Sequence, residues 1–305
     1  MRYATIATAD GRAIAAVEGD DVWDLTPALS EAGHRWADLS QAFAAEGGFD
    51  AVKAAAKTTT SDPLATDAAR FLSPLPRPDH VLAVAANYKA HIEETGTITY
   101  AAKAETSPWF FTKPQSSING HQSPIRLPTK YGDQVDWEAE LGVVIGKGGG
   151  SIAPEDAWDH IAGYTVVNDI SARRMQVPER SKLRERDSFH DWLHGKWFDT
   201  FCCVGPWIVA AEDFPHPDDV EISLTLNGDL MQQASTKMMI FPIPELIAFI
   251  SSIVTLRPGD LIATGTPEGT GKSIGRFLAE SDVVAASVAG IGTLTNPVER
   301  APDHA

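Results

Sequence analysis

The sequence predicts a mixed α+β protein built mainly of strands, in which a small N-terminal unit precedes a large sandwich or rolled sheet. Short apolar runs bounded by Gly, Pro or Asp recur along the chain, and few long helical patterns interrupt them. Prolines are concentrated at 73–78, and such a stretch is typical of a stiff linker. We therefore expect one domain at residues 1–75 and a second at 76–305.

The N-terminal part is expected to be a small α+β unit. Two strand-like runs, at 3–8 and 13–17, flank Asp10-Gly11, which is a hairpin turn signal. Apolar residues then follow helical spacing at 36–43 and 49–57. A hairpin followed by two helices is therefore predicted before the linker.

The larger part is rich in short strands. The expected strands are 81–85, 141–145, 161–170, 201–210, 222–226 and 261–264. Asn227-Gly228 predicts a tight type I′ hairpin, and one amphipathic helix is expected at 244–254 with a proline in its first turn. This order favours a largely antiparallel sandwich over a doubly wound sheet.

Composition excludes several classes of function. The net charge of −16 argues against nucleic acid as a partner, because phosphate binding needs clustered Lys and Arg. No apolar run approaches the length of a membrane span, and no signal region is expected at the N-terminus. The adjacent Cys202 and Cys203 cannot join distant parts of the chain, which suits a cytoplasmic protein.

Two glutamates stand just before a nearly continuous apolar strand. Glu138 and Glu140 are two residues apart, and strand side chains alternate between faces, so both carboxylates would point the same way. Like charges this close repel one another, and a hard divalent cation such as Mg²⁺, Mn²⁺ or Ca²⁺ would compensate them. The alternative is an edge strand with two solvated glutamates.

A third carboxylate ends another strand. Asp169 could complete an oxygen-ligand site with open positions, or it could simply cap a following helix. Arg173 and Gln176 come next at helical i, i+3 spacing, which would put them on one face near the cation. Surface residues on a short helix would show the same spacing.

His91 and Glu94 are three residues apart and would touch on a helical turn. A glutamate that orients a histidine is the usual arrangement of a general base, although a surface ion pair has the same pattern. The spacing of His190 and His194 suggests a zinc protease, but the glutamate after the first histidine is missing.

Taken together, these segments resemble the fumarylacetoacetate hydrolase family. The matching motifs run in family order from about residue 80 to 298: Asn87-Tyr88-x-x-His91-x-x-Glu94, Phe111-x-Lys113-Pro114, Gly120, Pro124-Ile125-x-x-Pro128, Glu138-x-Glu140-Leu141, Asn168-Asp169-Ile170-Ser171-Ala172-Arg173-x-x-Gln176, Lys196-Trp197-Phe198-Asp199, Gly228 and Thr264-Gly265-Thr266-Pro267. The N-terminal unit looks like the small domain of the longer bacterial members.

The resemblance implies a β-sandwich roll as the catalytic domain and a homodimer. It implies that Glu138, Glu140 and Asp169 bind Mg²⁺ or Mn²⁺, with Ca²⁺ as a further option, and that His91 and Glu94 form a catalytic dyad on a lid. The residues implied around the substrate are Lys196, with a catalytic role, and Arg173, Gln176, Lys113 and Thr266.

Two departures from the family pattern stand out. Ala85-Ala86 occupies the place where a glycine is expected before Asn87. The segment between Gln176 and Lys196 is long and charged, and it is expected to shape the substrate pocket.

The resulting hypothesis is a divalent-metal-dependent hydrolase that cleaves a carbon–carbon bond in a 2,4-dioxo acid, such as an acylpyruvate, during catabolism. A 2-oxo acid decarboxylase acting on oxaloacetate, or a keto–enol or hydroxymuconate-type isomerase, would use the same metal-stabilised enolate. An intact His91–Glu94 pair favours hydrolysis, since decarboxylation needs no activated water. The remaining alternative is a metal-stabilised binding module, which would have no need of the base.

Overall fold

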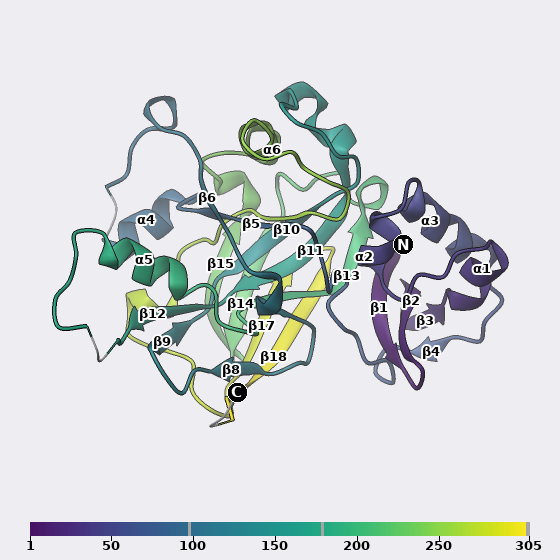
Figure 1. Cartoon of the computed structure of the whole chain (residues 1–305), viewed down its shortest axis with the longest axis horizontal. Coiled ribbons are helices and arrows are strands. Elements are labelled where there is room, and N and C mark those ends of the chain that lie inside the picture. Colours follow the sequence, from purple (N-terminus) through teal and green to yellow (C-terminus); the bar gives the residue numbers. More distant parts are fainter. Residues whose placement is uncertain (97–98, 178–179, 303–305) are drawn as a thin grey trace.

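The computed structural model describes residues 1–96, 99–177 and 180–302. Figure 1 shows a body of strands with the N-terminal unit on one side and helices α4 (Lys89–Thr95) and α5 (Asp187–His194) on the opposite side. The structure is mixed α and β with mostly strands, as the sequence predicts. None of the described helices is long and apolar enough to cross a membrane.

The N-terminal unit begins with the predicted hairpin. Strands β1 (Arg2–Thr8) and β2 (Gly11–Glu18) pair in antiparallel register, and Thr8 stands opposite Gly11. The unit continues with β3 (Asp21–Asp24), α1 (Thr26–Glu31), α2 (Leu39–Phe43), α3 (Gly48–Thr58) and β4 (Leu64–Ala65). Helices α2 and α3 fall where the apolar spacing predicts them.

The hairpin also joins the sheet of the larger part, because β1 pairs with β13 (Cys202–Ala210) through Arg2↔Val209 and Tyr3↔Ile208. The sheet then runs β4-β3-β2-β1-β13-β11-β10-β16-β5-β6, with β7 beside β13. The other members are β5 (Val81–Ala85), β6 (Trp109–Thr112), β7 (Ile118–Asn119), β10 (Ala139–Ile145), β11 (Ile161–Asp169) and β16 (Leu261–Ala263). The domain boundary at residues 75 and 76 stays a prediction.

A second sheet of five strands packs against this one in the order β15-β14-β17-β18-β8. Its members are β8 (Ile125–Leu127), β14 (Glu221–Leu226), β15 (Asp229–Ser235), β17 (Val283–Val288) and β18 (Gly292–Arg300). Asn227 and Gly228 both have positive φ between β14 and β15, which is the geometry of the predicted type I′ hairpin.

The remaining elements border these sheets. A short ribbon pairs β9 (Gly132–Asp136) with β12 (Ser171–Met175), and the helices are α4 (Lys89–Thr95), α5 (Asp187–His194), α6 (Ile243–Ser251) and α7 (Gly271–Ile274). Single 3₁₀ turns occupy Lys103–Glu105, Gln115–Ser117, Ala211–Asp213 and Thr236–Met238, and a longer 3₁₀ helix occupies Pro154–His160. Helix α6 falls on the predicted 244–254 segment.

The large sheet is apolar on both faces. Along β10, Leu141, Val143 and Ile145 pack in the core shared with the second sheet, whereas Val144 packs in the core that includes the N-terminal unit. Side chains alternate along a strand, so Glu140 lies on the same face as Val144. Val167 of β11 also packs in that second core, which puts Asp169 on the same face. The alternation therefore directs these carboxylates to one side of the sheet.

Candidate metal centre and active site

Three carboxylates meet where β10 and β11 run side by side. Ligand oxygens of Glu138, Glu140 and Asp169 all lie within 4.8 Å of one another. The backbone sets this proximity, because the Asp169 amide donates to the Glu138 carbonyl at 2.9 Å and the Glu138 amide donates to Asn168 Oδ1 at 2.9 Å. All three side chains are buried, which excludes the alternative of two solvated glutamates on an edge strand.

Two lysines neutralise part of this charge. Lys196 Nζ donates to Glu138 Oε2 at 2.5 Å and to Asp169 Oδ2 at 2.7 Å. The Lys113 ammonium donates to the other oxygen of Asp169, Oδ1. Burial acts against the charged form of Lys196, but the charges of Asp169 and Glu138 raise its pKa. Lys196 is therefore a fixed ammonium that bridges two of the three carboxylates.

The pKa values of Glu138 and Glu140 are shifted in opposite directions. Burial opposes ionisation of Glu138, yet the charges of Lys196 and Arg173 hold its pKa well below its usual range. Burial, and then the charges of Asp169 and Glu138, raise the pKa of Glu140 well above its usual range. A cation bound to this face would relieve that cost, so the three hard oxygen donors suit Mg²⁺ or Mn²⁺.

A strained backbone segment supports Glu140. The Gly265 amide donates to Glu140 Oε2 at 2.7 Å. Gly265 has φ +97°, and a Cβ built there would lie 2.8 Å from Asn87 Cβ, so only glycine fits. Asn87 itself is buried and donates to the Thr264 carbonyl at 2.8 Å. The family motif around Thr264 therefore packs directly against the one around Asn87.

His91 and Glu94 form the expected pair on helix α4. His91 Nδ1 lies 2.9 Å from Glu94 Oε1, and neither side chain is more than 17% exposed. Glu94 is also held from across the site, since the Gly269 amide and the Thr270 hydroxyl donate to it at 2.8 and 2.9 Å. Although burial acts in the opposite direction, these hydrogen bonds lower the pKa of Glu94 to about 2. A permanent anion thus orients the imidazole.

One cavity of about 940 Å³ joins these groups. Its wall includes His91, Glu138, Asp169, Lys196 and Thr266. The Thr266 hydroxyl donates to the Ala139 carbonyl at 2.9 Å, which fixes its position. The imidazole of His91 and the charged groups of the cluster therefore face a common space.

Arg173 lines the same cavity, but the helix expected at Arg173 and Gln176 is wrong. Arg173 lies on strand β12, which pairs with β9 through Ser171↔Asp136. The same pairing rules out Asp169 as a helix cap. Arg173 instead binds Asp136 Oδ2 at 2.8 Å and Glu138 Oε1 at 2.6 Å. Gln176 donates to Asp133 at 3.1 Å on the exposed side of the ribbon, away from the described cavity wall.

Asp136 belongs to the centre although the motif spacing did not single it out. It is fully buried and accepts hydrogen bonds from the amides of Trp137, Gly271 and Lys272 as well as from Arg173. A signal was present, because Asp136 continues the two-residue spacing of Glu138 and Glu140.

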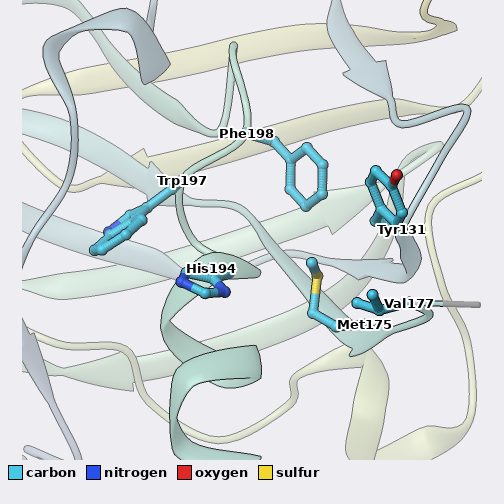
Figure 2. A pocket seen from close by; sticks show the side chains of 6 residues that line it. All are labelled: Tyr131, Met175, Val177, His194, Trp197 and Phe198. Carbon is cyan, nitrogen blue, oxygen red and sulfur yellow. The ribbon is translucent and has the colours of Figure 1, made fainter. Parts of the chain in front are cut away.

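A second hollow of about 390 Å³ is lined by His194 at the end of α5 and by Trp197 and Phe198, which follow this helix. Figure 2 shows Trp197, Phe198 and Tyr131 around it, with His194 at the end of the helix. Trp197 and Phe198 are thus separate from the cavity that holds the carboxylates, whereas Trp192 lines that cavity. No charged cluster accompanies this hollow among the residues that line it.

Known proteins that are similar to this chain belong to the family that the sequence motifs resemble. The family model for the fumarylacetoacetate (FAA) hydrolase C-terminal domain matches residues 80–299. Oxaloacetate tautomerase fahd2 of Xenopus laevis is 40% identical over 230 residues, which cover 75% of this chain and 68% of that protein.

Two solved structures cover nearly the whole chain. The maleylpyruvate hydrolase of Sphingobium sp. SYK-6, in complex with manganese(II) and pyruvate, is 30% identical, with a TM-score of 0.77 over 99% of this chain and all of that one. The 2-hydroxyhepta-2,4-diene-1,7-dioate isomerase of Mycobacterium marinum is 33% identical, with a TM-score of 0.70 over 98% of each chain.

Proposed function

Because the chain belongs to the fumarylacetoacetate hydrolase family, we propose that it is a divalent-metal-dependent hydrolase that cleaves a carbon–carbon bond in a 2,4-dioxo acid. Water adds to the distal carbonyl of an acylpyruvate, the bond to the methylene carbon breaks, and the products are a carboxylic acid and pyruvate. The observation that carries this proposal is that His91, which Glu94 orients, lies in the wall of the cavity that Glu138 and Asp169 also line.

Glu138, Glu140 and Asp169 would hold the ion, with Mg²⁺ or Mn²⁺ preferred over Ca²⁺. Their donor chemistry fits a hard cation, and the raised pKa of Glu140 indicates an uncompensated carboxylate. A bound divalent cation supplies positive charge that stabilises the enolate of a 2-oxo acid. The metal-containing relative from Sphingobium agrees with this choice of cofactor.

The side chains of the protein supply the other functions. Glu94 accepts the Nδ1 proton of His91, so Nε2 keeps its lone pair and can take a proton from water. Lys196 places a second positive charge beside the developing enolate. Thr266 lines the cavity at a fixed position, where its hydroxyl can orient the substrate.

A second candidate function is the keto–enol tautomerisation of oxaloacetate. It is favoured by the X. laevis relative, which carries that name. In this reaction His91 would move a proton between carbon and oxygen of the same enolate, and no bond between carbons would break. Isomerase and decarboxylase activities remain alternatives on the same centre, while the retained His91–Glu94 pair argues against a binding module without activity.

The test uses metal-stripped protein with acetylpyruvate and oxaloacetate, each with and without Mg²⁺ or Mn²⁺. Metal-dependent loss of the diketone absorbance with release of pyruvate supports the hydrolase. Oxaloacetate enolisation with untouched acetylpyruvate supports the tautomerase, and oxaloacetate loss with release of pyruvate and CO₂ supports the decarboxylase.

Two variants locate the chemistry. His91→Ala should lower kcat about 100-fold or more, as expected for loss of a general base. The matched control is His216→Ala, because His216 is exposed and does not line the cavity. Asp169→Ala should remove metal binding and turnover together. Normal activity in either site variant would refute the corresponding assignment.

A further inference from the structure

The cavity at the carboxylate cluster has two chemically different ends. Glu138, Asp169, Arg173 and Lys196 form the polar end. The side chains of the other end are large and apolar: Trp109, Phe110, Phe189, Trp192, Phe249 and Ile253. A volume of about 940 Å³ is far more than a four-carbon acid occupies, so a substrate bound at the polar end leaves the apolar end to be filled.

Aromatic rings connect the two ends without a break. Lys196 Nζ lies 5.5 Å from the centre of the Phe111 ring. The Phe111 ring packs edge-on against Trp192 at 5.0 Å, and Trp192 lies 5.9 Å from Phe189. A 2-oxo acid held beside Lys196 would therefore extend its distal group along this aromatic wall.

The apolar end is open to solvent. Trp109, Phe189 and Ile253 are 54%, 56% and 62% exposed. Single exposed apolar side chains are common on protein surfaces, but several around one cavity are typical of a binding surface. Phe189 and Trp192 come from helix α5, within the long charged segment between Gln176 and Lys196. From the described residues of that segment, this end of the cavity therefore receives aromatic rings and no charged side chain.

A second carboxylate on the substrate would need a cation at that end. Among the described residues that line the cavity, Arg173 and Lys196 are already paired with carboxylates, and Lys272 has none within 4.0 Å. The Lys272 amide donates to Asp136 at 3.0 Å and the charges of Arg173 and Asp136 act on its ammonium, so its side chain lies beside the polar end. Burial, followed by the nearby charge of Arg173, lowers the pKa of Lys272. The apolar end thus has no described cation to receive an anion.

We propose that the apolar end binds the acyl group of the substrate, and that the preferred substrates carry an aromatic or branched apolar acyl group in place of a second carboxylate. The placement of the 2-oxo acid end rests on the proposed function. Such a preference would distinguish this chain from enzymes that act on oxaloacetate, because oxaloacetate has a carboxylate at both ends.

The first experiment measures binding and needs no turnover. The Kd values of 4-phenyl-2-oxobutanoate and 2-oxoglutarate are determined by calorimetry on Mn²⁺-loaded protein. Both ligands carry the same 2-oxo acid group. In 4-phenyl-2-oxobutanoate, a phenyl ring stands in place of the distal carboxylate of 2-oxoglutarate. The phenyl compound should bind at least tenfold more tightly, because it buries apolar surface that 2-oxoglutarate cannot cover. Equal binding, or tighter binding of 2-oxoglutarate, would overturn the inference.

The variant Trp109→Ala tests the wall itself. It should bring the ratio of the two Kd values close to one. Trp158→Ala is the matched control, because Trp158 is 42% exposed and lies outside the cavity wall, and it should keep the wild-type ratio. A wild-type ratio in Trp109→Ala would contradict the assignment.

Turnover separates this inference from the proposed function. Benzoylpyruvate should have a higher kcat/KM than acetylpyruvate. Equal values, with clear hydrolysis of both, would refute the apolar subsite and leave the hydrolase intact. Preferential binding of the phenyl ligand without hydrolysis of either diketone would refute the hydrolase and support the subsite.

Discussion

Replacing Glu140 with glutamine should have opposite effects on the protein with and without metal. In the metal-free protein, burial and the neighbouring charges of Asp169 and Glu138 raise the pKa of Glu140. The carboxylate therefore destabilises the fold when it is ionised. With a divalent cation present, the same carboxylate is a ligand. Glu140→Gln should consequently be at least as stable as the wild type in a chelator, and less stabilised by added Mn²⁺.

The pH dependence follows from the direction of the pKa shift. Between the ordinary pKa of 4.5 and the raised pKa in the folded state, the unfolded chain releases this proton while the folded chain retains it. The unfolding free energy attributable to Glu140 therefore falls as pH rises, by up to about 1.4 kcal/mol per pH unit. Glutamine has no such proton, so the variant should lack this decline.

The metal effect can be scaled by mass action. A cation at 100 times its Kd stabilises the wild type by about 2.7 kcal/mol. If the loss of one anionic ligand weakens binding 100-fold, the same concentration stabilises the variant by only about 0.4 kcal/mol.

The assay is urea unfolding followed by tryptophan fluorescence, in chelator and in Mn²⁺, from pH 5 to 8. Glu245→Gln serves as the control, because Glu245 is a partly exposed residue of α6 that pairs with Lys103. Equal Mn²⁺ stabilisation of Glu140→Gln and the wild type would refute the ligand assignment. A metal-free wild type that gains stability over the variant as pH rises would refute the reasoning about charge.

Three further predictions concern the backbone and the base. The pKa of Glu94 is lowered to about 2, so the stability that its carboxylate contributes is present above pH 4.5 and is lost as pH falls toward 2. In Glu94→Gln, the unfolding free energy should therefore fall less steeply between pH 4.5 and pH 2. Ala86 has φ 56°, which costs an L-residue about 1–2 kcal/mol, so Ala86→Gly should raise the unfolding free energy by about 0.5–1 kcal/mol. An unchanged or lower unfolding free energy of this variant, measured by urea unfolding, would contradict the prediction. Asn87→Ala removes hydrogen bonds to Phe241 and Thr264 inside the protein and should cost about 3 kcal/mol by the same measurement, whereas a loss under 1 kcal/mol would show that water replaces them.

Sequence reasoning is most successful where a local rule determines the outcome. Alternation along a strand predicts that the carboxylates of Glu138 and Glu140 point the same way, and they meet in one cluster although Glu138 precedes the first residue of β10. The i, i+3 spacing of His91 and Glu94 predicts contact on a helical turn, and α4 provides it. Asn227-Gly228 predicts its hairpin for the same reason, since two positive φ angles are a local requirement.

Local rules fail to predict secondary structure where pairing with a segment distant in the sequence determines it. The spacing of Arg173 and Gln176 fits a helix as well as a strand, and it is pairing with β9, nearly 40 residues earlier, that makes the segment a strand. The departure at Ala86 is informative in another way. A glycine is expected at Ala85-Ala86, and the φ of 56° at Ala86 is a backbone conformation that glycine adopts at lower cost than alanine.

The balance of charge around the carboxylate cluster is the property that is hardest to predict from the sequence. Four carboxylates, those of Asp136, Glu138, Glu140 and Asp169, meet three cationic side chains, those of Lys113, Lys196 and Arg173. With Glu140 protonated, this set is neutral. With Glu140 ionised and a divalent cation bound, it carries one positive charge, which a monoanionic 2-oxo acid neutralises. A dianionic acid would place its second carboxylate at the apolar end, where no described residue of the cavity wall supplies a cation, and this agrees with an acyl group that carries no charge.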